Sequence, residues 1–370
     1  MKELLKKLIN AESTPEKGEL ASAEVLAEEF GKSGINCRIE TWEKNRANIT
    51  AQLTSDGRKK ALLFACHLDV VGPGEQKWDK PAFEATESDG KIYGRGSVDM
   101  KGGITACVTA IRQIVDSGMK LQGDIIFTAV AGEETDSCGA IRFVNDYDQL
   151  PDCVGIVIPE PTDFTIVRAH RGMFWLEITT KGKAAHGSTP HLGVNAINSM
   201  RLFLNELEDY EIPAQPHELL GNCSMSVNTI AGGKALNVVP DKCKIKVDIR
   251  TLPEQNHSDI ISDLEKIFAK IKSENPQFEA EVDVVREVQP LETDGNCDFI
   301  KDFCCAVGID ETVAVGFTTD GPHFAPLDAP VVIFGPGKPK LCHKPNEYIE
   351  INDLEKAVEY YKGIILKFLS

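Results

Sequence analysis

The sequence predicts an α/β protein: a larger, three-layer domain built on a mainly parallel sheet, with a smaller ferredoxin-like βαββαβ domain inserted into it. Short apolar runs alternate with helical stripes along most of the chain, which is typical of strands buried on both faces of a parallel sheet. A middle segment instead alternates apolar and charged residues, as half-exposed antiparallel strands do. A length of 370 residues also favours two domains over one.

The first predicted element is a helix in STPEKGELASAEVLAEEFGKSG, with Thr14 as its N-cap and Pro15 in its first turn. Helical spacing of apolar residues predicts further helices over about 104–115 and 354–368. Buried strands are predicted at the apolar runs 61–66, 124–130, 154–158, 312–315 and 331–334. Strands and helices in alternation make a layered α/β sandwich the expected architecture.

The middle third of the chain has its own element order. The expected elements are strand 173–180, helix 197–207, strand 224–230, strand 237–250, helix 260–271 and strand 278–286. This β-α-β-β-α-β order is that of a ferredoxin-like module. We therefore assign residues 1–171 and 288–370 to the larger domain and residues 172–287 to the inserted one.

Composition argues against several classes of partner. The net charge of 40 − 57 = −17 disfavours nucleic acid and anionic membrane surfaces. No apolar stretch approaches the roughly 20 residues that span a bilayer, and the amphipathic start lacks the apolar core of a signal peptide. Eleven cysteines without a CxxC pair or framework spacing indicate free thiols in a reducing compartment. We therefore expect a cytoplasmic protein that binds neither nucleic acid nor membrane.

Histidine and acidic residues follow the ends of the predicted buried strands. In chain order they are His67, Asp69, Glu133, Glu134, Glu160 and His343, and Asp99 lies between the first two of these strands, shortly before a predicted helix. Because ligands bind beyond the carboxyl ends of strands in open α/β sheets, we expect these side chains to collect at one edge. Two histidines and several carboxylates suit zinc, with cobalt or manganese as alternatives. The carboxylates are numerous enough to bridge two ions, as in two-metal hydrolases.

Each of these residues has a simpler interpretation when taken alone. Asp99 could be only a helix N-cap, and paired glutamates usually face water. Their coincidence at five strand-associated places is what favours a metal site. Asp69 lies two residues beyond His67 on the same strand face, where it is placed to orient the imidazole. The segment GRGSVD falls short of a dinucleotide fingerprint because Asp99 replaces its third glycine.

Five segments of the chain resemble one enzyme family in order and spacing. They are 67–103, 132–140 (GEETDSCGA), 159–162 (PEPT), 186–197 (HGSTPHLGVNAI) and 335–347 (GPGKPKLCHKPNE). The family is that of the co-catalytic zinc amidohydrolases, which includes acetylornithine deacetylase, succinyl-diaminopimelate desuccinylase, aminoacylase and carboxypeptidase G. The resemblance implies a catalytic α/β domain interrupted by a lid or dimerisation domain, two Zn²⁺ ions and a homodimer.

The resemblance also implies a ligand for each metal position. By matched position, His67, Asp99 and Glu160 would hold the first ion. Asp99 would bridge to the second ion, which Glu134 and His343 would complete. Members of the family have a cis peptide after the bridging aspartate, so the bond after Asp99 is expected to be cis.

The implied mechanism is hydrolysis of an amide bond. A water that bridges the ions would lose its proton near neutral pH, and Glu133 would accept that proton as general base. The hydroxide would attack the carbonyl, and Glu133 would pass the proton to the leaving amine, while Asp69 orients His67. His186 matches a histidine that the partner subunit's lid supplies to the oxyanion. Without the resemblance, a lone histidine in a polar loop would be read as structural.

Substrate recognition is expected to involve both domains. Arg250 matches a residue that grips the substrate's α-carboxylate, for which a forked guanidinium is suited. Asn237 matches another lid residue near the substrate, and Thr318 and Thr319 follow a buried strand and are expected to face the same region.

Two segments of the chain bear on the substrate, and they resemble different members of the family. The segment 159–197 resembles acetylornithine deacetylases, whereas TTDGP at 318–322 is closer to the desuccinylases. We expect hydrolysis of an N-acyl amino acid, with acetylornithine-type substrates preferred. A dipeptidase or carboxypeptidase is the alternative, and a non-catalytic ligand-binding homologue is the remote one.

Overall fold

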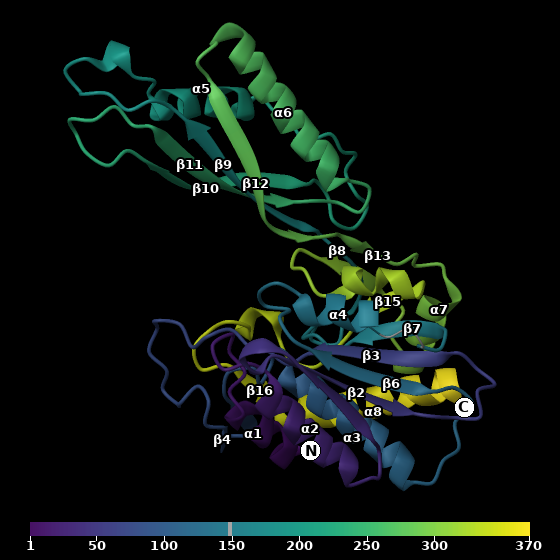
Figure 1. Cartoon of the computed structure of the whole chain (residues 1–370). Coiled ribbons are helices and arrows are strands. Elements are labelled where there is room, and N and C mark those ends of the chain that lie inside the picture. The colour runs from purple at the N-terminus through teal and green to yellow at the C-terminus, as the bar shows by residue number, and fades with distance from the viewer. Residues whose placement is uncertain (147–149) are drawn as a thin grey trace. The chain divides into compact units, whose positions relative to one another are not determined.

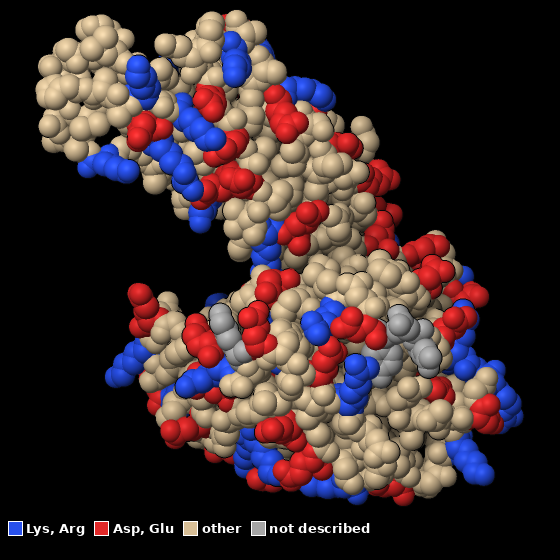
Figure 2. All heavy atoms as spheres, viewed as in Figure 1, with Lys and Arg blue, Asp and Glu red and all other residues tan. Residues whose placement is uncertain are grey.

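The computed structural model describes residues 1–146 and 150–370. They form two compact units (Figure 1). The larger comprises Met1–Ala169, Glu292–Ala314 and Thr319–Ser370, and the smaller comprises His170–Leu291 and Val315–Thr318. Within the described residues, every helix is too short or too polar to cross a membrane. On the face shown in Figure 2, basic side chains are interspersed with acidic ones rather than gathered into one patch.

A nine-stranded sheet runs through the larger unit in the order β1-β2-β6-β3-β7-β15-β8-β13, with β14 paired to β8. The four central strands, β6, β3, β7 and β15, are parallel, and β2 and β8 join them antiparallel. The strands are β1 Cys37–Thr41, β2 Ala47–Leu53, β3 Ala61–His67, β6 Ile125–Val130, β7 Cys153–Ile158, β8 Ile166–His170, β13 Leu291–Glu292, β14 Thr312–Val315 and β15 Val331–Ile333. The predicted α/β class with a mainly parallel sheet is confirmed.

Helices cover both faces of this sheet (Figure 1). Helices α2, α3, α7 and α8 share one core with the sheet, in which Phe64 and Phe127 are fully buried. Helix α4 packs on strands β2 and β6 outside that core. The helices are α1 Lys2–Asn10, α2 Leu20–Gly31, α3 Lys101–Asp116, α4 Cys138–Asp146, α7 Asp298–Val307 and α8 Ile351–Leu369. A small sheet completes the unit, with strands β4 Thr86–Ser88, β5 Lys91–Tyr93 and β16 Tyr348–Glu350.

The helix predicted from Thr14 begins later than expected. Its N-cap is Glu19, whereas the carbonyl of Thr14 accepts hydrogen bonds from the N–H groups of Lys17 and Gly18 in a separate turn. Gly18 has a φ of 78°, a left-handed conformation that ends this turn before the helix starts. The N-cap prediction at Thr14 was therefore wrong, although a helix does lie within the predicted segment.

The smaller unit has the βαββαβ order predicted from the sequence. Its elements are β9 Met173–Lys181, α5 Ala196–Glu208, β10 Ser224–Gly232, β11 Lys242–Arg250, α6 His257–Glu274 and β12 Glu279–Val288. The strands form an antiparallel sheet in the order β10-β11-β9-β12, and both helices pack on the face that carries Phe174, Leu176 and Ile178. The strand expected from residue 237 begins only at Lys242, because Pro240 has no N–H to donate to the ladder.

Candidate metal centre

The parallel strands of the larger unit bring residues from distant parts of the chain to one edge. His67 is the last residue of β3, Glu133 and Glu134 follow β6, and Glu160 follows β7. Because β6, β3 and β7 are parallel neighbours, their carboxyl ends lie side by side. Asp99 precedes helix α3, and the peptide between it and Met100 is cis, which confirms that prediction.

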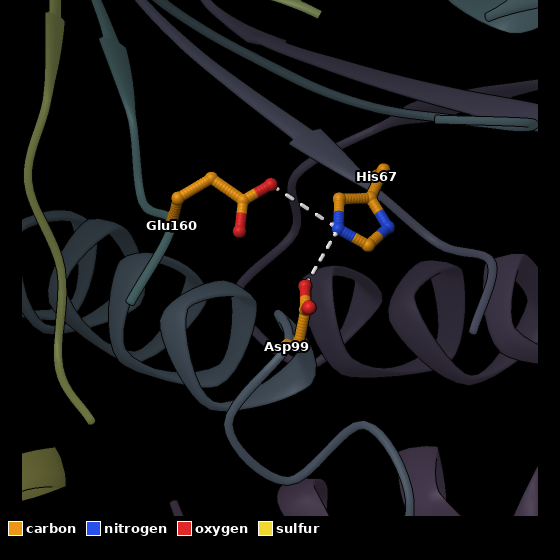
Figure 3. A group of neighbouring side chains, drawn as sticks. All are labelled: His67, Asp99 and Glu160. Atoms are coloured by element: carbon orange, nitrogen blue, oxygen red, sulfur yellow. Dashed lines mark hydrogen bonds and ion pairs between the residues drawn. The ribbon is translucent and has the colours of Figure 1, made fainter. Parts of the chain in front are cut away.

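His67, Asp99 and Glu160 form a first group of potential metal ligands. The Nε2 atom of His67 lies 3.1 Å from Oδ1 of Asp99 and 3.2 Å from Oε1 of Glu160. Figure 3 shows the two carboxylates approaching the same ring nitrogen from different sides. All three side chains are buried or nearly so. One nitrogen and two carboxylate oxygens that converge in this way are a donor set suited to a divalent cation.

A second group shares Asp99 with the first. The Nε2 atom of His343 lies 2.9 Å from Oε1 of Glu134 and 3.2 Å from Oδ2 of Asp99. Within each group of three, one ligand atom from each residue lies within 4.8 Å of the others. Asp99 thus turns one carboxylate oxygen to each histidine, which is the arrangement of a bridging ligand.

Asp69 contacts His67 and also the turn that carries the paired glutamates. The Nδ1 atom of His67 lies 3.0 Å from the backbone carbonyl oxygen of Asp69 and 3.5 Å from its carboxylate. That carboxylate accepts hydrogen bonds from the N–H groups of Gly132, Glu133 and Glu134 at 3.0 to 3.1 Å. The sequence places Asp69 near His67, and the role of Asp69 in orienting that ring stays a prediction. The contacts of Asp69 to the glutamate turn were not anticipated.

Desolvation and the charges of neighbouring groups shift the pKa values at the centre. Desolvation raises the pKa of Glu133 well above its ordinary value, and it raises the pKa of Glu160 to about 7 against the opposing charge of His67. Hydrogen bonds that His343 donates to the carboxylates of Asp99 and Glu134 raise the pKa of its imidazole to about 10. Burial lowers the pKa of His67, but nearby carboxylates outweigh it and hold that pKa well above 6.5. Several buried carboxylates lie close together here, and divalent cations would supply charge that neutralises them.

Several residues around the ligands were not found from the sequence. Arg46 donates from Nε to both oxygens of Glu19, at 3.1 and 3.0 Å, and its guanidinium lies 3.7 Å from Asp136 beside the glutamate turn. Asp320 lines a narrow pocket together with Glu133, and its charge contributes to the raised pKa of Glu133. The segment TTDGP could have pointed to Asp320, whereas nothing local marks the pairing of Arg46 with Glu19.

The remaining predicted residues belong mainly to the smaller unit. His186 is exposed, with Nδ1 2.7 Å from the hydroxyl of Ser188, and the carbonyl of Asn237 accepts a hydrogen bond from the neighbouring Gly187 at 2.7 Å. Arg250 ends β11 and pairs with Asp248 at 2.9 Å. The chain passes between the units at the predicted threonines, with Thr318 in the smaller and Thr319 in the larger.

Comparisons with known proteins agree over almost the whole chain. Residues 63–367 match the model of Peptidase family M20/M25/M40. A probable succinyl-diaminopimelate desuccinylase from Staphylococcus epidermidis is 31% identical, over 95% of this chain and 93% of the relative. Acetylornithine deacetylase from Myxococcus xanthus is 30% identical, over 84% of this chain and 81% of the relative. A solved M20 family metallo-carboxypeptidase from Sulfolobus solfataricus shares the fold, with a TM-score of 0.80 and 20% identity over 98% of both chains.

Proposed function

This chain belongs to peptidase family M20/M25/M40 and is a hydrolase of amide bonds, and from that premise we propose that it removes the acyl group from an N-acyl amino acid. The observation that carries the proposal is the carboxylate of Asp99, which serves two groups of metal-ligating residues at once. We propose that zinc occupies both positions, with cobalt or manganese as alternatives. The site of action that we propose is the cytoplasm.

Each side chain at the centre has a separate task in the proposed reaction. When bound, the two ions would polarise the amide carbonyl and lower the pKa of a water molecule towards neutrality. Glu133 receives the proton of the attacking water and delivers it to the leaving nitrogen, and it lines a narrow pocket together with His67 and Glu160. Asp69 supports this step because its carboxylate holds the N–H groups of the turn on which Glu133 lies. It also faces Nδ1 of His67, which leaves Nε2 of that ring for the first ion.

Acetylornithine-type substrates are our first choice and N-succinyl amino acids our second. The two relatives reported above carry the names of a deacetylase and a desuccinylase at nearly equal identity. Arg250 would bind the α-carboxylate, with Asn237, Thr318 and Thr319 contributing to the substrate site. A peptidase that cleaves short peptides is the alternative, and the fold shared with the metallo-carboxypeptidase supports it. A short peptide also has a carboxylate near the scissile amide, which Arg250 would bind in the same way.

We also propose that the protein acts as a homodimer in which His186 reaches the metal centre of the partner subunit. Support comes from β10, which ends the four-stranded sheet and exposes apolar side chains along an unpaired edge. The exposed large apolar residues of this strand and its surroundings are Leu192, Ile197, Val227, Ile230, Leu236 and Val238. Burial of such an edge against a second copy would satisfy both its hydrogen bonds and its apolar surface.

A hydrolysis panel tests the reaction and its need for metal together. Purified protein loaded with zinc or cobalt is assayed on N-acetylornithine, N-succinyl-diaminopimelate, other N-acyl amino acids and several dipeptides, with and without a chelator. We expect hydrolysis of an N-acyl amino acid that a chelator abolishes and added metal restores. Cleavage of dipeptides alone would favour the peptidase alternative. No hydrolysis of any substrate by metal-loaded protein would overturn the enzymatic proposal in favour of a ligand-binding protein.

A further inference from the structure

Arg95 and Glu347 form a buried ion pair next to the candidate metal ligands. Arg95 is 2% exposed and Glu347 is 1% exposed, and Nη1 of Arg95 donates to Oε2 of Glu347 at 2.6 Å. A buried ion pair adds little net stability compared with apolar residues of similar size, because both charges must be desolvated. A contribution to stability therefore does not explain the pair, and its other hydrogen bonds show which segments it holds.

The second carboxylate oxygen of Glu347 holds the backbone that carries Asp99. Oε1 accepts hydrogen bonds from the N–H of Val98 at 2.8 Å and from the N–H of Asp99 at 3.2 Å. The backbone carbonyl of Glu347 also accepts the N–H of Gly94 at 2.9 Å. Three contacts from one residue thus fix the segment from which the shared carboxylate projects.

The same ion pair holds the loop that carries His343. Glu347 lies four residues after His343, and Nη1 of Arg95 also donates to the carbonyl of Lys344 at 3.3 Å. His343 has a φ of 61°, which is uncommon for a residue with a side chain. Its side chain is 52% exposed, so tight packing does not hold it in place. Anchoring of the loop must therefore position this ligand.

We propose that Arg95 and Glu347 are positioning residues for the second metal position, formed by Asp99, Glu134 and His343. The pair connects the Asp99 backbone to the His343 loop. In this arrangement Nε2 of His343 lies 3.2 Å from Oδ2 of Asp99. The first position depends less on the pair, because His67 and Glu160 project from strand ends of the central sheet. This inference rests on the two-metal centre of the proposed function.

Metal stoichiometry tests the inference without relying on activity. Glu347→Gln keeps the size of the side chain and removes its charge, and Glu29→Gln is the matched control. Glu29 pairs with Arg112 between α2 and α3, away from the ligands. Bound zinc is measured by elemental analysis at controlled free zinc, and cobalt titrations follow the visible absorption of each position. We expect two ions in the wild type and in the control. In Glu347→Gln we expect one tightly bound ion and a second bound about 10–100-fold more weakly.

Selective loss of one ion separates positioning from general destabilisation, which would weaken both positions. Two ions of unchanged affinity in Glu347→Gln would overturn the inference and leave the proposed function intact. Fewer than two ions in the wild type under saturating zinc would instead contradict the two-metal centre itself. If Glu347→Gln does not fold, Arg95→Lys is measured in the same way. It keeps the charge but not the forked contacts, so selective weakening of the second ion supports the inference, and wild-type affinities overturn it.

Discussion

Glu133 and Glu134 are adjacent in the chain, but their side chains have different surroundings. Oε1 of Glu134 lies 2.9 Å from Nε2 of His343, whereas Glu133 lines the narrow pocket beside His67. Both residues lie in the turn that follows β6, and this turn places their side chains in these different surroundings. The proposed function assigns the proton to Glu133 and a metal ion to Glu134.

The different surroundings of the two glutamates predict that glutamine will have a different effect at each position. Glu133→Gln should keep both ions and lower kcat by about 10²–10⁴-fold, because an amide cannot accept the proton. Glu134→Gln should weaken the second ion. Steady-state kinetics and elemental analysis on the same preparations measure both effects. Near wild-type kcat in a metal-replete Glu133→Gln protein would show that the general base is another residue.

The ligands could be proposed from the sequence because each follows a recognisable buried strand or a family motif. Their supporting contacts could not, since these join residues that are distant in the chain. Arg95 and Glu347 are 252 positions apart, and neither lies in a pattern that predicts its partner. Arg46 and Glu19 likewise meet only because α2 packs beside β2. Pairings of this kind depend on the complete fold.

At the scale of elements, the start of helix α3 packs closely against the end of strand β7. A Cβ atom on Gly103 would lie 2.1 Å from the carbonyl oxygen of Pro159, and Glu160 is the next residue. Gly103→Ala should therefore displace the segment that carries Glu160. We expect a loss of about 1–3 kcal/mol in the free energy of unfolding, as for other overpacked sites. We also expect weaker binding of the first ion.

Gly363→Ala in helix α8 is the control for this substitution. The nearest atom to its added Cβ is the carbonyl oxygen of Ala306 at 3.4 Å, which is an ordinary contact distance. Alanine here should raise the free energy of unfolding by roughly 0.5–1 kcal/mol, because glycine loses more backbone entropy on folding. Denaturant titration of metal-free protein and zinc titration measure the two responses. Equal behaviour of both variants would contradict the close packing inferred at Gly103.

Apolar runs identified the strands at the centre of the sheet but not strand β2. This strand buries Asn48 and Thr50, which a search for apolar runs passes over. Asn48 bonds to the backbone of Ala131 and Gly139, and the hydroxyl of Thr50 lies 3.3 Å from that of Thr128. Buried polar residues with complete hydrogen bonds are stable in a core. Their partners are visible only after the chain has folded.

At the scale of the whole molecule, the proposed dimer predicts that two inactive variants restore each other. His186→Ala lacks the histidine donated to the partner, and Glu133→Gln lacks the base of its own centre. After subunit exchange, about half of the dimers are mixed, and one of the two centres in each is complete. Activity should then return to about a quarter of the wild-type value. Kinetics before and after exchange measure this, with sedimentation to confirm the dimers. Mixed dimers without recovered activity, or a fully active monomer, would exclude the role in trans.

The order of the segments in the larger unit has a consequence for how the protein is made. His67, Asp99, Glu134 and Glu160 all precede the smaller unit, whereas His343 and Glu347 follow it. Because synthesis runs from the N-terminus, the first group of ligands leaves the ribosome before the smaller unit, and His343 leaves after it. A nascent chain stalled before residue 343 lacks His343 and therefore cannot complete the second metal position. Completion of the metal centre is therefore a late event in the biosynthesis of this protein, and it requires nearly the entire chain.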